Sequence, residues 1–342
     1  LSGLLVSTFG VAACSSAETH YALTFEEPRH YDFGNRVFFG DVDGDGNVDA
    51  MSSPGSAPPA VKLGRGDGSF APYQSVGSSA SVVALSDLNG DKRADIVDGY
   101  PLAVEYAQPG PSYSRGEAIR GSFVAVADVD GDGYPEIVSR NVNGATVATV
   151  VDGSGNVLKT ITIANDSLDV QSIGDVNGDG KADFASDGTL LLSGPSGYAP
   201  SKIDLGSLEI LSTVAGDLDR DGKADLVVTS KESGRDRYVI TVMKGAGDGK
   251  FGAVSQMAIE EKMSATPVLV DINGDGALDL ALAMTTGVRF HFGDNKGAFA
   301  LGGIELAMDS PATQMVFVDV NHDGKKDLLA SHPGSFDVFL NR

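Results

Sequence analysis

Short apolar runs alternate with polar, glycine-rich segments along nearly the whole chain. Runs such as SFVAVA at 122–127 and LALAM at 280–284 contain few polar residues and end at clusters of Asp and Gly. Runs of this length and composition are typical of strands buried on both faces. The pattern therefore predicts an all-β protein built from many short strands.

A nine-residue acidic motif recurs seven times, each time between two apolar runs. Its first residues are separated by 41 to 54 residues. The copies read DVDGDGNVD from Asp41, DLNGDKRAD from Asp87, DVDGDGYPE from Asp128, DVNGDGKAD from Asp175, DLDRDGKAD from Asp217, DINGDGALD from Asp271 and DVNHDGKKD from Asp319. A third apolar run, a Gly-rich turn and a weaker fourth run follow the motif. Each repeat thus predicts a four-stranded antiparallel meander.

Sheets of this kind must stack, because one sheet alone cannot bury two apolar faces. Stacking with radial closure predicts a seven-bladed β-propeller, and the alternative is an open solenoid. The chain ends favour closure: the seventh repeat stops after its third strand, SFDVFLNR, and a strand-like segment, HYALTFEE at 20–27, precedes the first repeat. We expect this N-terminal strand to complete the last blade, with residues 20–342 forming one domain.

Oxygen-bearing side chains occupy motif positions 1, 3, 5 and 9. They can converge on one cation if the loop turns sharply, which Gly at position 6 permits, and a backbone carbonyl at position 7 adds a further ligand. Hard oxygen ligands of this number indicate Ca²⁺. An EF-hand is excluded because position 12 is acidic in one copy alone, at Asp98. A metal-free acidic turn is the alternative, and the seven copies favour calcium.

The motif resembles the FG-GAP or VCBS repeat, the calcium-binding hairpin of integrin α-subunit propellers and of many bacterial surface proteins. The resemblance covers residues 20–342 and implies up to seven calcium ions. The implied ligands are Asp41, Asp43, Asp45, Asp49, Asp87, Asn89, Asp91, Asp95, Asp128, Asp130, Asp132, Glu136, Asp175, Asn177, Asp179, Asp183, Asp217, Asp219, Asp221, Asp225, Asp271, Asn273, Asp275, Asp279, Asp319, Asn321, Asp323 and Asp327.

The second motif departs from this pattern. Lys92 stands at position 6, where a left-handed residue other than Gly costs about 1–2 kcal/mol. We therefore expect the site that begins at Asp87 to be the weakest of the seven.

The first residues differ from the repeats. Residues 1–14, LSGLLVSTFGVAAC, are uncharged and apolar and end in the chain's one cysteine. The segment VAAC resembles the lipobox of bacterial lipoproteins, which implies a truncated signal peptide, lipidation of Cys14 and a tether at 15–19. The alternative is an N-terminal strand with a buried thiol. On the first interpretation the protein is exported and held at the outer membrane or cell surface, or in the periplasm.

Composition limits the class of partner. The net charge of −22 argues against nucleic acid as a ligand, because phosphates would be repelled, and no apolar run reaches the roughly 18 residues that span a bilayer. The seven motifs contain 24 of the 47 acidic residues. The acidity is therefore explained largely by the predicted metal sites and does not indicate a class of partner. We expect a monomer that contacts the membrane through a lipid anchor alone.

The recognisable motifs of the chain are the predicted calcium loops, and their expected role is to stabilise the fold. We therefore favour a calcium-stabilised, non-enzymatic binding or adhesion module with a protein or glycan ligand. A lectin is one alternative, although Trp is absent, and a polysaccharide lyase is a less favoured one.

A ligand is expected on the face opposite the calcium loops. Loops that join second to third strands emerge there, and the longest repeat spacing includes an enlarged loop at 230–237. The candidate ligand residues on that face are Tyr100, Arg140, Arg235 and Arg237.

Overall fold

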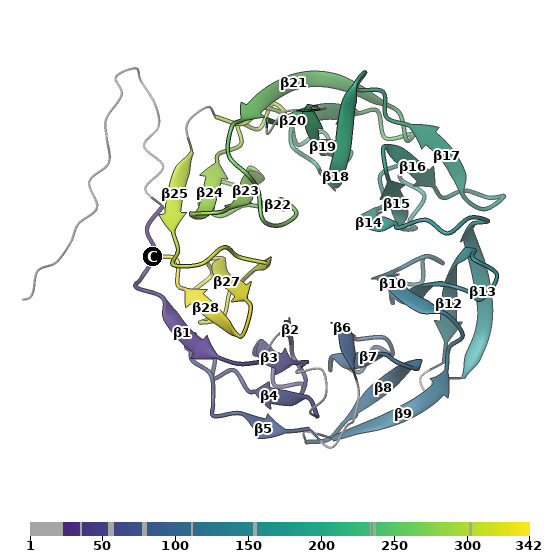
Figure 1. Cartoon of the computed structure of the whole chain (residues 1–342), viewed down its shortest axis with the longest axis vertical. Helices are drawn as coiled ribbons and strands as arrows, with labels where there is room; N and C mark the ends of the chain where they lie inside the picture. Colours follow the sequence, from purple (N-terminus) through teal and green to yellow (C-terminus); the bar gives the residue numbers. More distant parts are fainter. Residues whose placement is uncertain are drawn as a thin grey trace, which may run out of the picture.

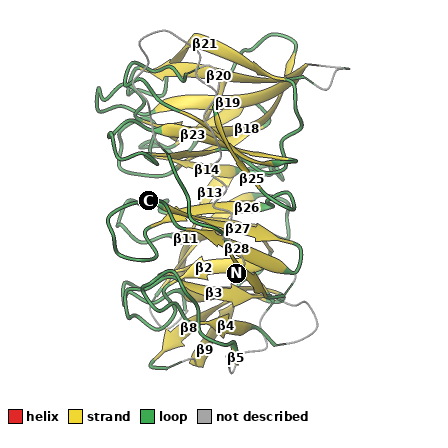
Figure 2. Ribbon diagram, turned by 90° about the vertical axis from the view of Figure 1, so that its left-hand side faces the viewer, coloured by secondary structure: helices red, strands yellow, loops and turns green. Residues whose placement is uncertain are grey.

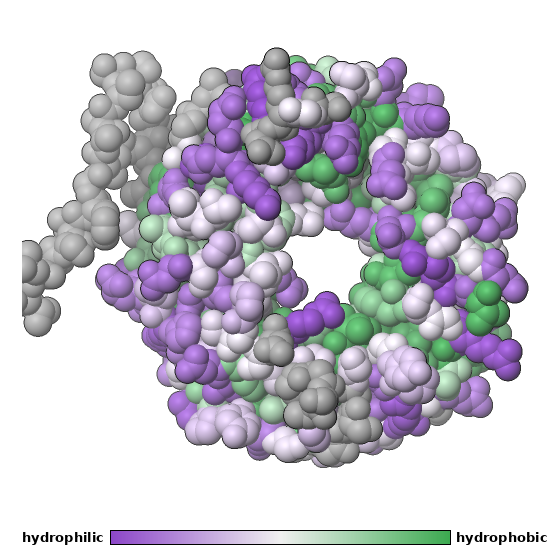
Figure 3. All heavy atoms as spheres, in the orientation of Figure 1, coloured by the Kyte–Doolittle hydropathy of each residue, from purple (hydrophilic) through white to green (hydrophobic). Residues whose placement is uncertain are grey.

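The fold is a closed ring of β-sheets. The computed structural model describes residues 23–34, 36–53, 58–76, 81–110, 112–152, 156–232, 234, 237–300 and 303–342. These residues form seven four-stranded antiparallel sheets, arranged around a central channel (Figures 1 and 3). The seven-bladed β-propeller is confirmed. Seen edge-on, the strands cross the thickness of the ring and the loops lie at its two faces (Figure 2).

The strands of each blade follow one another from the channel outward. The innermost strands are β2 (Val37–Gly40), β6 (Val82–Ser86), β10 (Ser122–Ala127), β14 (Gln171–Gly174), β18 (Leu208–Gly216), β22 (Val268–Val270) and β26 (Gln314–Val318). The second strands are β3 (Asp49–Ser52), β7 (Asp95–Gly99), β11 (Glu136–Arg140), β15 (Asp183–Ser186), β19 (Asp225–Glu232), β23 (Asp279–Met284) and β27 (Asp327–His332).

The third and fourth strands complete the blades. The third strands are β4 (Ala60–Lys62), β8 (Leu102–Gln108), β12 (Thr146–Val151), β16 (Thr189–Leu192), β20 (Tyr238–Gly245), β24 (Gly287–His291) and β28 (Ser335–Phe339). The outermost strands are β5 (Gln74–Ser75), β9 (Ser112–Ala118), β13 (Val157–Ala164), β17 (Ala199–Lys202), β21 (Phe251–Ile259), β25 (Ile304–Ala307) and β1 (Arg29–Asp32). We number the blades 1 to 7 from β2 to β26.

The hydrophobic core is divided among the junctions between blades. Each buried cluster combines side chains from two adjacent blades, as Leu226 and Val228 of blade 5 do with Leu190 of blade 4. The second strands are buried over most of their length, and every residue of β23 and β27 is buried. Stacking between blades therefore buries both faces of each sheet, as the unalternated apolar runs predicted.

An N-terminal strand closes the ring, but its position differs from the prediction. The strand is β1, which pairs with β28 from Arg29 opposite Val338 to Asp32 opposite Ser335. Within the predicted segment 20–27, Phe25 forms a bridge to Asn341, and residues 20–22 lie outside the described part of the chain. Pro28 separates the two pairings, because it has no amide hydrogen to donate to the ladder.

Aromatic contacts attach this closing segment to the last two blades, Tyr31 to blade 7 and Phe25 to blade 6. Tyr31 stacks on Phe336, with ring centroids 5.0 Å apart, and Phe25 stacks on Phe290 at 5.8 Å. The amide of Glu26 also donates to the carbonyl of Leu340, at 2.8 Å. The two ends of the chain are thus joined by backbone pairing and by ring packing.

Within the described ranges, the chain has no helix of the length and apolarity needed to cross a membrane.

Candidate functional site

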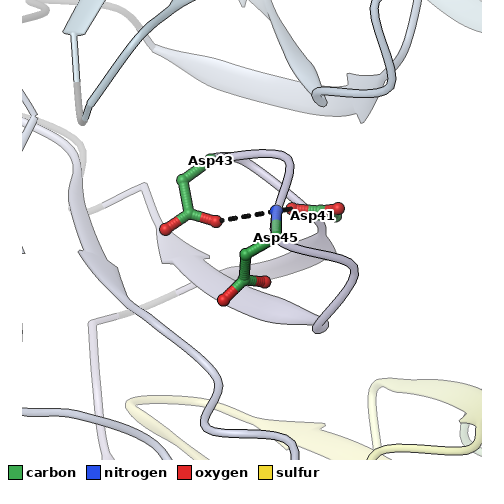
Figure 4. Close-up of side chains that lie close together, drawn as sticks. All are labelled: Asp41, Asp43 and Asp45. Carbon is green, nitrogen blue, oxygen red and sulfur yellow. Dashed lines mark hydrogen bonds between the residues drawn. The ribbon is translucent and has the colours of Figure 1, made fainter.

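All seven acidic motifs lie in the loops between first and second strands, on one face of the ring. We call these loops 1 to 7 after their blades. In loop 1 the amides of Gly44 and Gly46 donate to Oδ1 and Oδ2 of Asp41, at 2.7 and 2.8 Å. Asp43 and Asp45 accept the amides of Asp45 and Asn47, and Figure 4 shows the three carboxylates around this curled backbone. The motif therefore folds into a tight turn that gathers its own carboxylates.

Two positions of the motif require a left-handed backbone. Position 6 was predicted to do so, and Gly46 has a φ of 88°. Lys92 adopts the same conformation, with a φ of 68°, and its amide still donates to Asp87. Position 4 is also left-handed, with a φ of 61° at Arg220 and 58° at His322. The sequence analysis missed position 4, although five of the seven copies have Gly there.

Carboxylate oxygens converge most closely where position 3 is Asp. Three loops bring three such oxygens within 4.8 Å of one another, namely Asp41, Asp43 and Asp45, then Asp128, Asp130 and Glu136, and finally Asp217, Asp219 and Asp225. The other four loops have Asn at position 3, which offers a neutral oxygen. This donor set, hard oxygens on a turn of fixed shape, fits Ca²⁺. Calcium binding remains a prediction for all seven loops.

The carboxylate at position 9 is buried and has a second role. Asp49 accepts the amide of Val42 from its own loop and the amide of Gly64 from the end of the third strand, both at 2.8 Å. Asp95, Asp183, Asp225, Asp279 and Asp327 repeat this arrangement. Position 9 thus ties the loop to the third strand of its blade.

Burial changes the charge state that these carboxyls prefer. Loss of solvent raises the pKa of Asp49 and Asp95 to about 7, although backbone amides oppose the shift. The pKa of Glu136 is likewise raised to about 7 by burial, and that of Asp279 to about 6. A bound divalent cation stabilises the ionised form of such a carboxyl group. These positions are therefore better suited to binding a metal than to holding an isolated negative charge.

Neighbouring loops contact one another around the ring. The Nε of Arg93 donates to the carbonyl of Asp43 in the preceding loop, at 3.1 Å. Arg220 donates to the carbonyls of Asp275 and Gly276 in the next loop, at 3.0 and 3.2 Å. The loops therefore support one another across blade junctions.

The ligand-face candidates lie at the opposite ends of the strands. Tyr100 is 89% exposed in the loop between β7 and β8. Arg140 pairs with Asp169, and Arg237 pairs with Glu232 at 2.5 Å and with Glu260. Arg235 lies outside the described residues, as do Cys14 and the segment 15–19.

The described candidates, Tyr100, Arg140 and Arg237, do not form one cluster. They belong to blades 2, 3 and 5, and blade 5 is across the ring from blade 2 (Figure 1). Carboxylates already engage Arg140 and Arg237, which weakens the hypothesis that their guanidinium groups are free to bind an anion.

Two hollows on this face were not anticipated from the sequence. One, of about 310 Å³, lies between blades 7 and 1 beside Arg36, Gln314 and Ser331. The other, of about 190 Å³, lies between blades 4 and 5 beside Ser186 and Ile210. The hydroxyls of Ser331 and Ser186 are buried and have no hydrogen-bond partner among the described residues. No motif marks these hollows, because each combines residues from two repeats.

Comparison with known proteins finds structures with a similar fold and a family model that matches the repeat. The chain resembles the structure of an Agrocybe aegerita lectin that recognises non-reducing terminal N-acetylglucosamine, with 19% identity, 81% of each chain covered and a TM-score of 0.62. It also resembles BBS1N in its complex with ARL6DN, with 12% identity, coverage of 94% of this chain and 97% of that chain and a TM-score of 0.63. These likenesses concern the fold alone. No curated protein sequence matches the chain significantly.

The repeat itself is matched more directly. The model of the FG-GAP-like repeat matches residues 41–97, 217–282 and 271–330, which together make up half of the chain. Each matched segment begins at position 1 of an acidic motif. The chain therefore belongs to the FG-GAP-like repeat family.

Proposed function

We propose that the protein is a calcium-stabilised binding module without catalytic activity, exported to the bacterial cell surface or the periplasm. On this proposal the loops on one face hold calcium and maintain the ring, while the other face engages a protein or glycan ligand. The observation that carries the proposal is this separation of acidic loops from hollows on opposite faces.

Several features support calcium as the stabilising ion. Backbone amides of each loop donate to carboxylates of the same loop, as Gly44 and Gly46 do to Asp41, and this turn gathers the oxygens that calcium needs. Their carboxylates account for about half of the acidic residues of a chain with a net charge of −22. Divalent cations at these loops reduce the repulsion that such a charge creates.

The hollows support a ligand on the opposite face. Both lie at a junction between blades, where loops from two repeats meet. Each contains a buried hydroxyl without a partner among the described residues, and a polar ligand supplies the hydrogen bond that such a group lacks. Arg36 is exposed at the larger hollow and adds a positive charge.

A lectin is the second candidate, because a lectin is among the structures that share this fold. The unpaired hydroxyls of Ser186 and Ser331 suit a ligand that is rich in hydroxyl groups. The described part of the chain also displays aromatic rings, such as Tyr73 and Tyr100, on which a sugar ring can stack.

A glycan array in millimolar calcium tests for the glycan ligand that both candidates allow. Arg36→Ala, at the larger hollow, is compared with Arg65→Ala, an exposed arginine in the turn after β4 on the calcium face of the same blade. We expect Arg36→Ala to reduce binding and Arg65→Ala to leave it unchanged. Equal loss in the two variants, or loss with Arg65→Ala alone, contradicts the assignment of the binding face.

Export and the absence of catalysis have separate tests. Metabolic labelling with a fatty-acid analogue is expected to label the parent through Cys14 and not Cys14→Ser, and an unlabelled parent contradicts the anchor. Assays on acidic polysaccharides are expected to show no depolymerisation. Release of unsaturated sugar products contradicts the non-enzymatic assignment.

A further inference from the structure

One lysine reaches into a calcium loop from the strand beside it. Lys244 lies in β20, and its Nζ contacts the carboxylate of Asp219 and is 3.2 Å from Oδ2 of Asp221. These are motif positions 3 and 5 of loop 5, whose Asp217, Asp219 and Asp225 converge within 4.8 Å. An ammonium group therefore lies against two of the carboxylates that a calcium ion needs.

The strand register shows that this lysine is particular to blade 5. In each blade, the residue that follows motif position 9 pairs with a residue of the third strand. In blade 5 this pair is Leu226 and Met243, and Lys244 directly follows Met243 in the sequence. In the other six blades this place is held by Leu63, Tyr106, Val150, Leu192, Phe292 and Leu340. An apolar residue is thus the rule at a place where blade 5 has a cation.

Other lysines near the acidic loops make fewer contacts with the predicted ligands. Lys159 is 2.8 Å from Oδ2 of Asp130, a single carboxylate of loop 3. Lys250, in the turn after β20, pairs with Asp248, which lies outside the motif. Among the described lysines, Lys244 is the one that bridges two ligand positions.

We infer that Lys244 competes with calcium for loop 5 and raises the calcium concentration at which that loop fills. This inference rests on the proposed calcium-binding function. Calcium needs the oxygens of Asp219 and Asp221, so the ammonium must leave before the ion is fully bound. The Lys244 side chain is 50% exposed and can move into solvent. At low calcium the ammonium group of Lys244 partly neutralises the carboxylates of Asp219 and Asp221 and so stabilises the conformation of loop 5.

Hydrogen exchange measured peptide by peptide can follow each loop separately. The full chain is stripped of metal and titrated with calcium, and protection of the peptide that contains 217–225 gives a midpoint for loop 5. Lys244→Leu introduces the residue that three other blades have at this place. Lys250→Leu is the matched control, because it removes an equal charge from the same hairpin, and Lys244→Arg keeps the charge.

Lys244→Leu is expected to lower the calcium midpoint of loop 5 by roughly threefold to tenfold. Lys250→Leu and Lys244→Arg are expected to keep the midpoint of the parent, and the midpoints of the remaining loops are expected to stay in place. An unchanged or higher midpoint in Lys244→Leu, while other loops respond to calcium, overturns the inference and leaves the proposed function standing. If no loop of the parent responds to calcium, the proposed function fails and the inference fails with it.

Discussion

At the scale of single residues, the acids of one motif have different environments. Asp327, at position 9 of loop 7, has no exposed surface and accepts the amides of Val320 and Asn341, at 3.0 and 2.8 Å. Asp323, at position 5, is exposed and accepts amides of its own loop. Position 9 therefore has a structural role that does not depend on metal.

Asp327→Ala leaves two buried amides without an acceptor. Each unsatisfied amide costs about 1–3 kcal/mol, so the free energy of unfolding is expected to fall by roughly 2–5 kcal/mol. Denaturant unfolding in excess EGTA measures this loss with calcium removed. Asp309→Ala, which removes an exposed acid from the loop between β25 and β26, is the control. A variant as stable as the parent in EGTA contradicts the structural role of position 9.

A buried histidine links the last blade to the closing strand. Nδ1 of His332 is 3.1 Å from the carbonyl of Pro311, and Nε2 is 3.1 Å from Asp337. Asp337 also meets His30, whose other nitrogen faces Asp32. Both nitrogens of His332 thus face acceptors, which suits the charged imidazolium, and the hydrogen bond to Asp337 raises the pKa of His332 above 6.5.

The contribution of His332 is therefore expected to depend on pH. A raised pKa in the folded state stabilises the protein fully below about pH 6.5, and this gain is lost as the pH rises through the folded value. His332→Gln is expected to lower the melting temperature more at pH 6 than at pH 8.5, in saturating calcium. Equal losses at the two pH values, or a larger loss at pH 8.5, contradict the charged state.

At the scale of elements, the closing strand β1 is the one outermost strand that does not follow the third strand of its own blade in the sequence. Every other blade is continuous in sequence, whereas blade 7 takes its outer strand from the opposite end of the chain. Removing that strand exposes the edge of β28 and uncovers the ring of Phe336. Exposed strand edges invite pairing between molecules.

A chain that begins at Phe33 is therefore expected to melt at a markedly lower temperature than the parent, or to aggregate. A chain that begins at Leu23, which keeps the closing segment, is expected to melt like the parent. Light scattering and thermal melting measure the two effects. If the chain from Phe33 is as stable and monomeric as the parent, closure by β1 is not needed.

The elements differ in how far the sequence predicts them. Strands, blade number and loop position follow from a motif repeated seven times, because each copy confirms the spacing of the others. The closing strand occurs once, so no second copy fixes its position, and its main pairing lies at Arg29–Asp32 and not in the predicted segment 20–27. The contact of Lys244 with loop 5 and the ion pair of Arg140 depend on strand register, which a single sequence does not reveal.

At the scale of the whole molecule, the net negative charge opposes formation of the compact ring. The chain has a net charge of −22, and its acidic loops lie on one face of the ring. Repulsion among them opposes the compact state, and divalent cations bound between carboxylates relieve it. An extracellular site with a dissociation constant of about 10⁻⁴–10⁻³ M contributes about 1.4 kcal/mol when free calcium is tenfold above that constant. Several such sites together rival the stability of a domain.

The most direct test of the account is the melting temperature of the full chain in 10 mM calcium and in excess EGTA. We expect EGTA to lower it by more than about ten degrees, because the folded state alone presents the assembled loops. Magnesium at the same concentration is the control for ionic strength and is expected to restore little of the loss. Equal melting temperatures in calcium and in EGTA would contradict the claim that the seven loops are calcium sites.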